Sequence, residues 1–387
     1  MRRIVVVGAS LAGHQAAMTL RKLGYEGALT IVGSEPHRPY DRCALSYEYL
    51  RGETDRAGLD LGPDVPDADW RLASTATWLD LERRTVVLDH TERLGYDGLV
   101  IASGARPRDR AMVDDVEGAF VLRTVEDASA LRSALFAGQR RVVVVGGGLI
   151  GVEVADTAAA AGHDTTLVHG GDLPAERALG RPVAAYASRL LRARPVHLRA
   201  HARARRLDVR RGRVEGVVLD DGSHLRADVV LMATGTRPNV EWLRGSGLSV
   251  AGGVNCGPTL HALGADRVVA AGDVARTTQP LLDGARVRVQ HWASTLDQAA
   301  LAAANLLSGR DCARDHTSLP WFGSLIGGSE IRCVGFPHAA DGAEVVWGSL
   351  EDGRAALVLS GANRPVAAVT VNATERLPQL ESQLQVR

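Results

Sequence analysis

Two segments of the chain repeat one pattern, and this repetition constrains the fold more than any other feature of the sequence. Residues 4–17 read IVVVGASLAGHQAA, and residues 142–155 read VVVVGGGLIGVEVA. In each copy a run of β-branched residues precedes a glycine-rich turn, and a helical pattern follows the turn. A further strand pattern comes after each helix, at residues 29–32 and 165–169. Each copy therefore predicts a strand, a helix and a second, parallel strand.

The glycine-rich turns suit the phosphates of a dinucleotide. Backbone N–H groups and the start of the following helix face such an anion, and side chains at the turn would hold it away. The glycines of the second copy complete the G-x-G-x-x-G pattern: Gly146, Gly148 and Gly151. The first copy has Gly8, Ser10 and Gly13, so a small hydroxyl replaces the middle glycine. Glu35 follows the second strand of this copy, where an acidic residue would bind ribose hydroxyls.

The repeats extend beyond the two loops. Each copy is followed later by a strand that ends in Ser/Thr-Gly-x-Arg-Pro, as SGARPR at residues 103–108 and as ATGTRP at residues 233–238. Residues 290–307 have the pattern of a long alanine-rich helix, and strand patterns with glycine turns continue from residue 316. Two nucleotide-binding units in one chain indicate that a hydride donor is brought next to a tightly held acceptor. FAD with NADH or NADPH is the obvious pair.

These patterns predict an α/β protein in three parts. Two are Rossmann-like dinucleotide-binding domains, and the third is a C-terminal α+β domain. We expect a discontinuous FAD-binding domain at residues 1–110 and 240–315, with an inserted NAD(P)-binding domain at 111–239. The C-terminal domain is expected at residues 316–387.

Composition excludes several other functions. The formal net charge of the 387 residues is zero, which argues against a nucleic-acid or membrane-surface protein. The four cysteines are widely spaced without a CxxC pair, so neither a disulfide framework nor a metal site is expected. Lys22 is the only lysine, which argues against lysine-based catalysis. The opening MRRIVVVG lacks the apolar run of a secretory signal, so we expect a cytoplasmic protein.

Several motifs, taken in their order and spacing, resemble one known family across essentially the whole chain. They are EPHRPYDRCALSYEYLRG (35–52), SGARPR, GGGLIGVEVA, ATGTRPNVEWL, AAGDVA and QHWASTLDQAALAAANLL. The chain is similar to the flavin-dependent, NADH-linked ferredoxin reductases that serve oxygenases and cytochromes P450. These enzymes belong to the glutathione-reductase-like flavoproteins with two dinucleotide sites.

The resemblance assigns roles to individual residues. It implies that FAD lies along the first loop, with Glu35 at the adenosine ribose, Arg42 near the pyrophosphate, Asp273 at the ribityl chain and Trp292 near the isoalloxazine. The first-loop positions are Gly8, Ser10, Ala12 and Gly13. The same resemblance implies that Glu153 is a catalytic residue close to the nicotinamide. The second cofactor-binding set comprises Gly146, Gly148, Gly151, His169 and Gly235.

The reaction implied by the resemblance is hydride transfer from NAD(P)H to the flavin N5, followed by single-electron transfer to a ferredoxin. Ferredoxins are usually acidic, so a surface rich in arginine would favour their encounter. Candidate positions are Arg38, Arg42 and Arg51, or the denser arginine run at residues 199–213. A monomer and a homodimer are both compatible with the sequence.

The sequence departs from the family pattern around the expected flavin and nicotinamide. Tyr47 stands where the family has a lysine that pairs with the helix glutamate, so we expect Glu153 to be partly protonated or paired elsewhere. His169 replaces the ribose-binding glutamate, which leaves the choice between NADH and NADPH open with NADH favoured. Gln290 replaces a glutamate, and Gly323 replaces a tryptophan expected beside the nicotinamide.

Cys43 supports an alternative function. It aligns with the redox cysteine of the coenzyme A disulfide reductases and NADH peroxidases, so the chain could be a Cys43-dependent disulfide or peroxide reductase. A small buried apolar role for Cys43 is the other interpretation. A further alternative is a specialised flavoprotein oxidase of a biosynthetic pathway.

Overall fold

A computed structural model describes residues 1–384, which form two compact units. Each unit is assembled from separate stretches of the chain. Unit 1 contains Met1–Asp41, Asp60–Arg106 and Arg237–Pro320. Unit 2 contains Arg42–Leu59, Pro107–Thr236 and the chain from Trp321 onward. Residues far apart in sequence therefore share one core within each unit.

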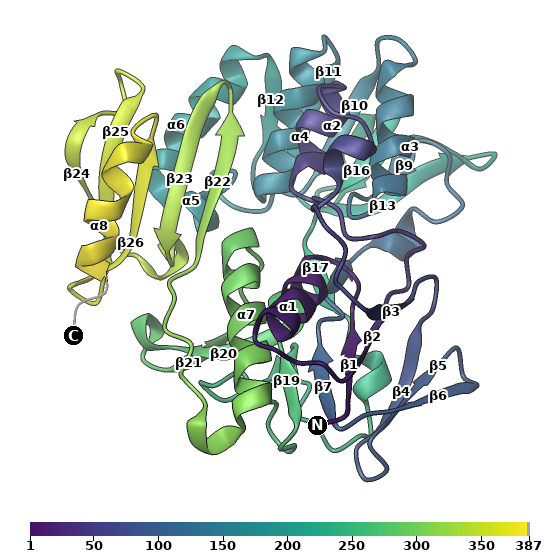
Figure 1. Ribbon diagram of the computed structural model, residues 1–387. Coiled ribbons are helices and arrows are strands. Elements are labelled where there is room, and N and C mark those ends of the chain that lie inside the picture. Colours follow the sequence, from purple (N-terminus) through teal and green to yellow (C-terminus); the bar gives the residue numbers. More distant parts are fainter. Residues whose placement is uncertain (385–387) are drawn as a thin grey trace. The chain divides into compact units, whose positions relative to one another are not determined.

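Unit 1 is built on a parallel five-stranded sheet in the order β19-β7-β1-β2-β3 (Figure 1). The strands are β1 (Arg3–Val7), β2 (Ala28–Val32), β3 (Ala68–Arg71), β7 (Gly98–Ile101) and β19 (Val268–Ala270). Ile4 and Val6 are at most 1% exposed, because helices cover a parallel sheet and leave its apolar strands buried. Helices α1 (Leu11–Lys22) and α7 (Trp292–Ser308) pack against each other in this unit.

Two small sheets complete unit 1. One is antiparallel and consists of β4 (Ala76–Asp80), β5 (Thr85–Leu88) and β6 (Glu92–Gly95). The other has the order β18-β20-β21, with β18 at Val254–Asn255, β20 at Ala275–Gln279 and β21 at Ala285–Val287. Leu79 and Val86 of the first of these sheets share a buried cluster with Trp242.

Unit 2 contains a second parallel sheet, in the order β12-β11-β10-β16-β9. Its strands are β9 (Ala119–Phe120), β10 (Arg141–Val145), β11 (Asp164–Val168), β12 (Val196–Arg199) and β16 (Val229–Met232). The helices of this part are α3 (Val125–Phe136), α4 (Leu149–Ala160), α5 (Glu176–Leu179) and α6 (Arg181–Ala193). A capping box between Thr124 and Asp127 fixes the start of α3.

A three-stranded antiparallel sheet extends the same part of unit 2. It consists of β13 (Ala204–Arg210), β14 (Arg213–Leu219) and β15 (His224–Arg226). The chain passes between the units at β8 (Ala105–Pro107) and β17 (Thr236–Pro238), which form a two-stranded sheet.

The last part of unit 2 is an antiparallel sheet in the order β22-β23-β26-β25-β24 with one helix, drawn in yellow and green in Figure 1. The elements are β22 (Trp321–Ile326), β23 (Ser329–Gly335), β24 (Gly342–Ser349), β25 (Arg354–Gly361), β26 (Arg364–Val371) and α8 (Leu377–Leu384). A short 3-10 helix, η1 (Ala44–Ser46), and helix α2 (Glu48–Arg51) also belong to unit 2, where they contact α3 and α4.

The strand order places both glycine loops at equivalent points. In unit 1 the chain runs outward from β1 to β2 and later returns to β7 on the other side of β1. In unit 2 it runs outward from β10 to β11 and returns to β16. Ligands of such sheets bind at the carboxyl ends of the strands where the strand order reverses. Each glycine loop begins at that point.

The predicted α/β fold, with two Rossmann-like sheets and a C-terminal α+β part, is confirmed. The helix predicted at residues 290–307 is α7, and the strands predicted at 29–32 and 165–169 are β2 and β11 within one residue at either end. Strands β13 to β15 were not predicted from the sequence, because the outward arginines in them obscure the alternation of apolar and polar residues. The assignment of FAD to 1–110 and 240–315, NAD(P) to 111–239 and a separate domain to 316–387 stays a prediction.

Candidate active site

The first glycine loop is shaped by two close backbone approaches. Gly8 has a φ of +127°, and a Cβ added there would collide with the carbonyl oxygen of Ala102 at the end of β7. A Cβ on Gly13 would collide with the carbonyl oxygen of Gly8. The amide of Gly8 donates a 2.7 Å hydrogen bond to the carbonyl of Val32, which ties the loop to β2. Ser10 is the N-cap residue of α1. Only glycine fits Gly8 and Gly13, as the sequence pattern indicated.

The second loop repeats this geometry. Gly146 has a φ of +126°, and a Cβ added there would collide with the carbonyl oxygen of Ala233 at the end of β16. A Cβ on Gly151 would collide with the carbonyl oxygen of Gly146. The amide of Gly146 donates a 2.8 Å hydrogen bond to the carbonyl of Val168. The two loops are therefore matched atom for atom at their glycine contacts.

Gly148 differs from the other loop glycines, because the protein around it does not require a glycine. A Cβ added there meets no atom within 4 Å, and its φ of −79° is open to any residue. Gly148 is the N-cap residue of α4, whose first backbone N–H groups lack partners within the helix. The free space beside it lies where a phosphate would approach those donors. The loop therefore fits the pyrophosphate of a dinucleotide.

Two carboxylates of unit 1 were expected to bind FAD. Glu35 follows β2, and its Oε2 accepts a 2.5 Å hydrogen bond from the hydroxyl of Tyr40. Asp273 lies in a short 3-10 helix (Gly272–Val274) and does not cap a following α-helix. A Cβ on Gly272 would lie 2.9 Å from the Cβ of Ala12, so this segment packs directly against α1. The contact between Gly272 and Ala12 places Asp273 beside the helix that follows the first loop.

Three further predicted FAD or nucleotide residues lie in different settings. Trp292 is the half-buried first residue of α7 in unit 1. Arg42 belongs to unit 2, where its Nη1 donates a 2.8 Å hydrogen bond to the carbonyl of Arg123. Gly235 has a φ of +107°, and its carbonyl accepts a hydrogen bond from the amide of Arg108. Their contacts with a cofactor stay predictions.

Glu153 is paired with two serine hydroxyls. The Oγ of Ser46 donates to its Oε2 and the Oγ of Ser324 donates to its Oε1, each at 2.7 Å. Ser46 lies on η1, Glu153 on α4 and Ser324 on β22, so three separate stretches of unit 2 meet at this carboxylate. Burial raises the pKa of Glu153, the two serine hydrogen bonds lower it, and the charge of Glu48 raises it. Without a lysine partner, Glu153 therefore has new partners in the two serines and a raised pKa, which are the two outcomes that the sequence suggested.

The cation missing at position 47 appears one helical turn later. Arg51 lies with its guanidinium carbon 3.7 Å from the centre of the Tyr47 ring and donates a 2.6 Å hydrogen bond to the Tyr47 hydroxyl. Its Nη2 is 3.6 Å from the carboxylate of Asp156, which is fully buried. Arg194 lies 3.0 Å from the other carboxylate oxygen, and the amide of Gly327 also donates to Asp156. Arg51 therefore pairs with Asp156, and Glu153 is bound by the two serines.

This cluster contains residues that the sequence analysis missed. Asp156, Arg51 and Arg194 were not assigned a role as a group, although the spacing of Tyr47 and Arg51 is that of helix neighbours. Asp156 follows Glu153 on the same face of α4, and a carboxylate on an otherwise apolar helix face was the available signal. Because Arg51 is engaged here, it is not free to form the arginine surface considered for a ferredoxin.

Cys43 has an exposed thiol and is the residue that precedes η1. The hydroxyl of Ser46 lies 3.3 Å from its carbonyl oxygen. Cys43 therefore belongs to the same segment that supplies Ser46 to Glu153. Its redox role stays a prediction.

His169 ends the second strand of the second repeat, where the sequence predicted a nucleotide contact. It is 4% exposed and directly follows β11. A Cβ on Gly147 would lie 2.7 Å from the Cβ of His169, so the glycine loop packs directly on this histidine. Burial lowers the pKa of His169, the Gly171 backbone raises it, and the charges of His201 and Arg192 lower it. The ring is therefore neutral near pH 7 and carries no negative charge.

The described part of the chain offers no metal centre. Across residues 1–384 no group of three or more histidine, cysteine, aspartate or glutamate side chains is arranged to hold a metal ion. Nor does any helix within those residues have the length and apolar character needed to cross a membrane.

Comparison with known proteins identifies the family. The family model described as pyridine nucleotide-disulphide oxidoreductase matches residues 2–299. The chain belongs to this family. The match spans both glycine loops and the AAGD segment, which are the parts with the paired geometry described above.

Three individual proteins are similar to the chain over most of its length. The ferredoxin–NAD(+) reductase component of the biphenyl dioxygenase system of Paraburkholderia xenovorans is 35% identical over 381 residues, which cover 96% of this chain and 90% of that protein. The rhodocoxin reductase of Rhodococcus erythropolis is 34% identical over 355 residues, with 90% and 82% coverage. A chain of the covalent putidaredoxin reductase–putidaredoxin complex matches with a TM-score of 0.92 and 30% identity, with 99% and 93% coverage. The predicted resemblance to ferredoxin reductases is confirmed.

The two kinds of loop glycine predict opposite effects of an added methyl group. Gly151→Ala should destabilise the apoprotein by about 1–3 kcal/mol, because the methyl group has no space beside Gly146. Gly148→Ala should change the free energy of unfolding by less than about 1 kcal/mol and weaken NADH binding at least about tenfold. Thermal unfolding and an NADH titration measure both effects. Unchanged NADH binding by Gly148→Ala would contradict the assignment of this loop.

The raised pKa of Glu153 predicts a pH-dependent stability. A carboxyl group whose pKa is higher in the folded than in the unfolded state loses stability as pH rises from the unfolded pKa, about 4.3, toward the folded pKa. Glu153→Gln cannot ionise, so its melting temperature should rise relative to the wild type between pH 5 and 8. The corresponding difference in the free energy of unfolding between the two proteins should grow by at most about 1.4 kcal/mol per pH unit.

Ser324→Ala provides the matched control for that experiment. It removes a hydroxyl that lowers the pKa of Glu153, so its stability should fall more steeply over the same pH range than that of the wild type. Parallel stability curves for the wild type, Glu153→Gln and Ser324→Ala would show that the pKa of Glu153 is not raised.

Proposed function

We propose that this chain is an NAD(P)H-dependent flavoprotein reductase that passes electrons to a ferredoxin serving an oxygenase or a cytochrome P450. The observation that carries the proposal is the pair of matched glycine loops, one in each unit of a single chain. Two such loops serve two dinucleotides, and a reductase needs both a donor and a held acceptor. The similarity to ferredoxin reductases over nearly the whole chain supports the choice of partner.

Unit 1 holds FAD in this proposal. The loop from Gly8 to Gly13 and the start of α1 bind the pyrophosphate. At the two glycines no side chain stands between the backbone N–H groups and the phosphates. Glu35 binds the adenosine ribose, and Asp273 binds the ribityl chain from its place against α1. Trp292 of the same unit is a further proposed FAD contact, and the role of Arg42 near the pyrophosphate stays a prediction from the family resemblance.

Unit 2 binds the nicotinamide cofactor. The open space at Gly148 and the start of α4 receive its pyrophosphate, and His169 lies at the adenosine end. When bound, the flavin supplies the ability to accept a hydride and release its electrons singly. Burial raises the pKa of Glu153, and the hydrogen bonds from Ser46 and Ser324, which lower that pKa, fix the orientation of the carboxyl group. Glu153 is the proposed catalytic residue.

The proposed partner is an acidic iron–sulfur protein, and the arginine run at residues 199–213 is the better-supported docking surface. Arg205, Arg210 and Arg211 are exposed on β13 and the turn after it, and no ion pair of theirs occurs within residues 1–384. By contrast, Arg38 lies 3.5 Å from Asp64 and packs over the Trp70 ring. Uncompensated positive charge favours encounter with an acidic partner at low ionic strength.

We propose the cytoplasm as the compartment. All four cysteines lie among the described residues, where none of them forms a disulfide, and Cys43 and Cys312 are exposed. Exposed cysteines outside disulfides persist in a reducing compartment and are rare in an oxidising one.

The proposed function predicts rapid reduction of the flavin. Under anaerobic conditions, stopped-flow mixing of the flavin-loaded protein with NADH should bleach the flavin absorption in well under about one second. Addition of an oxidised ferredoxin should then restore that absorption. If neither NADH nor NADPH bleaches the flavin, the reductase function is wrong.

The alternative Cys43-dependent reductase predicts a different electron count. In our proposal, dithionite titration of the wild type and of Cys43→Ser should each take up about two electrons per flavin, and both proteins should reduce ferredoxin at rates within about twofold. Uptake of about four electrons by the wild type, reduced to two by Cys43→Ser, would replace the ferredoxin function by thiol-based reduction of a disulfide or peroxide.

A further inference from the structure

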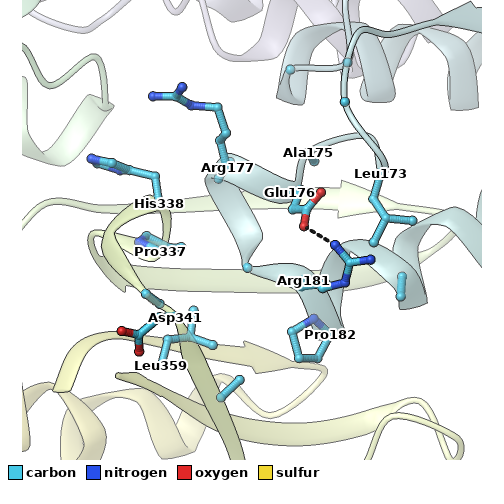
Figure 2. Close-up of a pocket in the computed structure, with 18 of the residues that line it drawn as sticks. Leu173, Ala175, Glu176, Arg177, Arg181, Pro182, Pro337, His338, Asp341 and Leu359 are labelled. Carbon is cyan, nitrogen blue, oxygen red and sulfur yellow. Dashed lines mark hydrogen bonds and ion pairs between the residues drawn. The ribbon is translucent and has the colours of Figure 1, made fainter. Parts of the chain in front are cut away.

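Helix α4 carries a second carboxylate one turn after Glu153, and that carboxylate has an unusual setting. Asp156 is fully buried and forms ion pairs with two arginines. For comparison, Glu176 and Arg181 pair in the lining of the pocket beside the second glycine loop, where the Arg181 side chain is 67% exposed (Figure 2). An exposed pair contributes little to stability, and apolar residues often replace a buried pair without loss. Burial of Asp156 therefore calls for a reason other than stability.

Asp156 and Glu153 both bind the segment that contains η1 and α2. Glu153 binds it through Ser46, the last residue of η1. Asp156 binds it through Arg51, the last residue of α2, whose Nη2 lies 3.6 Å from the Asp156 Oδ2. The Arg51 guanidinium also covers the ring of Tyr47 and donates a 2.6 Å hydrogen bond to its hydroxyl. Tyr47 directly follows Ser46, so the ion pair restrains this serine as well.

The same two carboxylates also bind the hairpin of β22 and β23. Glu153 binds it through Ser324 on β22. The Oδ2 of Asp156 accepts a 3.1 Å hydrogen bond from the amide of Gly327. Gly327 and Gly328 have φ values of +59° and +84° and close the hairpin in a two-residue turn. Such a turn fixes the register of its strands, so the bond at Gly327 restrains Ser324 three residues earlier.

The second arginine of Asp156 belongs to neither segment. Arg194 is the C-cap residue of α6, and its Nε lies 3.0 Å from the Asp156 Oδ1. It supplies positive charge to the same carboxylate as Arg51 does, without a chain connection to either serine-bearing segment. The two arginines therefore differ in what they hold, although both pair with one group.

We propose that Asp156 is a positioning residue for Glu153, because it holds the two segments that bring Ser46 and Ser324 to the Glu153 carboxyl group. This inference rests on the proposed function, in which Glu153 is the catalytic residue. Burial raises the pKa of Glu153, and the two serine hydrogen bonds lower it. Through the serines, Asp156 therefore influences the proton affinity of Glu153.

The two arginines provide a matched pair of variants. Arg51→Gln and Arg194→Gln each remove one guanidinium group from Asp156, but only Arg51 lies in a serine-bearing segment. Arg51→Gln should loosen Ser46 and increase the proton affinity of Glu153 at least about threefold, because a hydrogen bond to the charged form is weakened. Arg194→Gln should change that affinity less than about twofold.

Infrared titration of the purified protein measures this proton affinity without turnover. The C=O stretching band of the protonated Glu153 carboxyl group is assigned by its loss in Glu153→Gln. Equal changes in the two arginine variants would overturn the proposal, because the altered charge at Asp156 would then account for both. An unchanged or lower proton affinity in Arg51→Gln would also overturn it.

A Ser46→Ala background separates positioning from a direct effect of the Arg51 charge. If Arg51 acts through Ser46, Arg51→Gln should change the proton affinity of Glu153 less than about twofold in this background. An increase as large as that in the otherwise wild-type protein would overturn the positioning role.

Asp156→Asn tests the carboxylate itself, since it removes the charge and keeps an oxygen for the Gly327 amide. We expect the proton affinity of Glu153 to rise. Loss of a nearby negative charge would by itself lower that affinity, so the sign of the change distinguishes the two effects. A fall would overturn the proposal. The arginine pair decides the question should Asp156→Asn not fold.

Reduction kinetics separate failure of this inference from failure of the proposed function. The pH dependence of flavin bleaching by NADH should shift to higher pH in Arg51→Gln and stay in place in Arg194→Gln. Bleaching of the wild type without any difference between the variants in the infrared titration leaves the reductase function intact and overturns the role of Asp156. If neither NADH nor NADPH bleaches the wild type, the proposed function is wrong, and the infrared titration still decides whether Asp156 positions the partners of Glu153.

Discussion

The structure depends on a backbone contact that occurs twice, between the first glycine of each loop and the carbonyl at the end of the neighbouring strand. At Gly8 the carbonyl belongs to Ala102, and at Gly146 it belongs to Ala233. Neither position has space for a Cβ, so each loop turns sharply from its strand into its helix. That turn aims the helix N-terminus at the carboxyl end of the sheet, where a phosphate binds. The proposed binding of two nucleotides follows from this contact.

The interior of unit 2 shows how the chain keeps two carboxylates on one helix without a lysine nearby. Asp156 forms ion pairs with both Arg51 and Arg194, whereas Glu153 accepts hydrogen bonds only from neutral hydroxyls. Burial without a neighbouring cation raises the pKa of Glu153, whereas Asp156 lies in ion pairs with two guanidinium groups. The aromatic ring of Tyr47 holds Arg51 in place for this division. With Tyr47 in place of a lysine, the two carboxylates of α4 are thus held by different partners.

The loops and the fold class could be predicted from the sequence because their causes are local. A glycine that touches a backbone carbonyl cannot be replaced, and buried parallel strands need runs of β-branched residues such as 142–145. The carboxylate cluster could be predicted only in part. The loss of a cation for Glu153 followed from Tyr47, but its partners lie at positions 46 and 324, which no periodic pattern connects. The pairing of Asp156 with Arg194 likewise depends on how α4 and α6 pack, which the sequence of neither helix determines alone.

In the proposed function the first loop holds a flavin permanently in each chain. The most direct measurement is the absorption spectrum of the purified protein, followed by denaturation and quantification of the released nucleotide. We expect a yellow protein that releases about one FAD per chain. A colourless protein that takes up no FAD when it is supplied would contradict it.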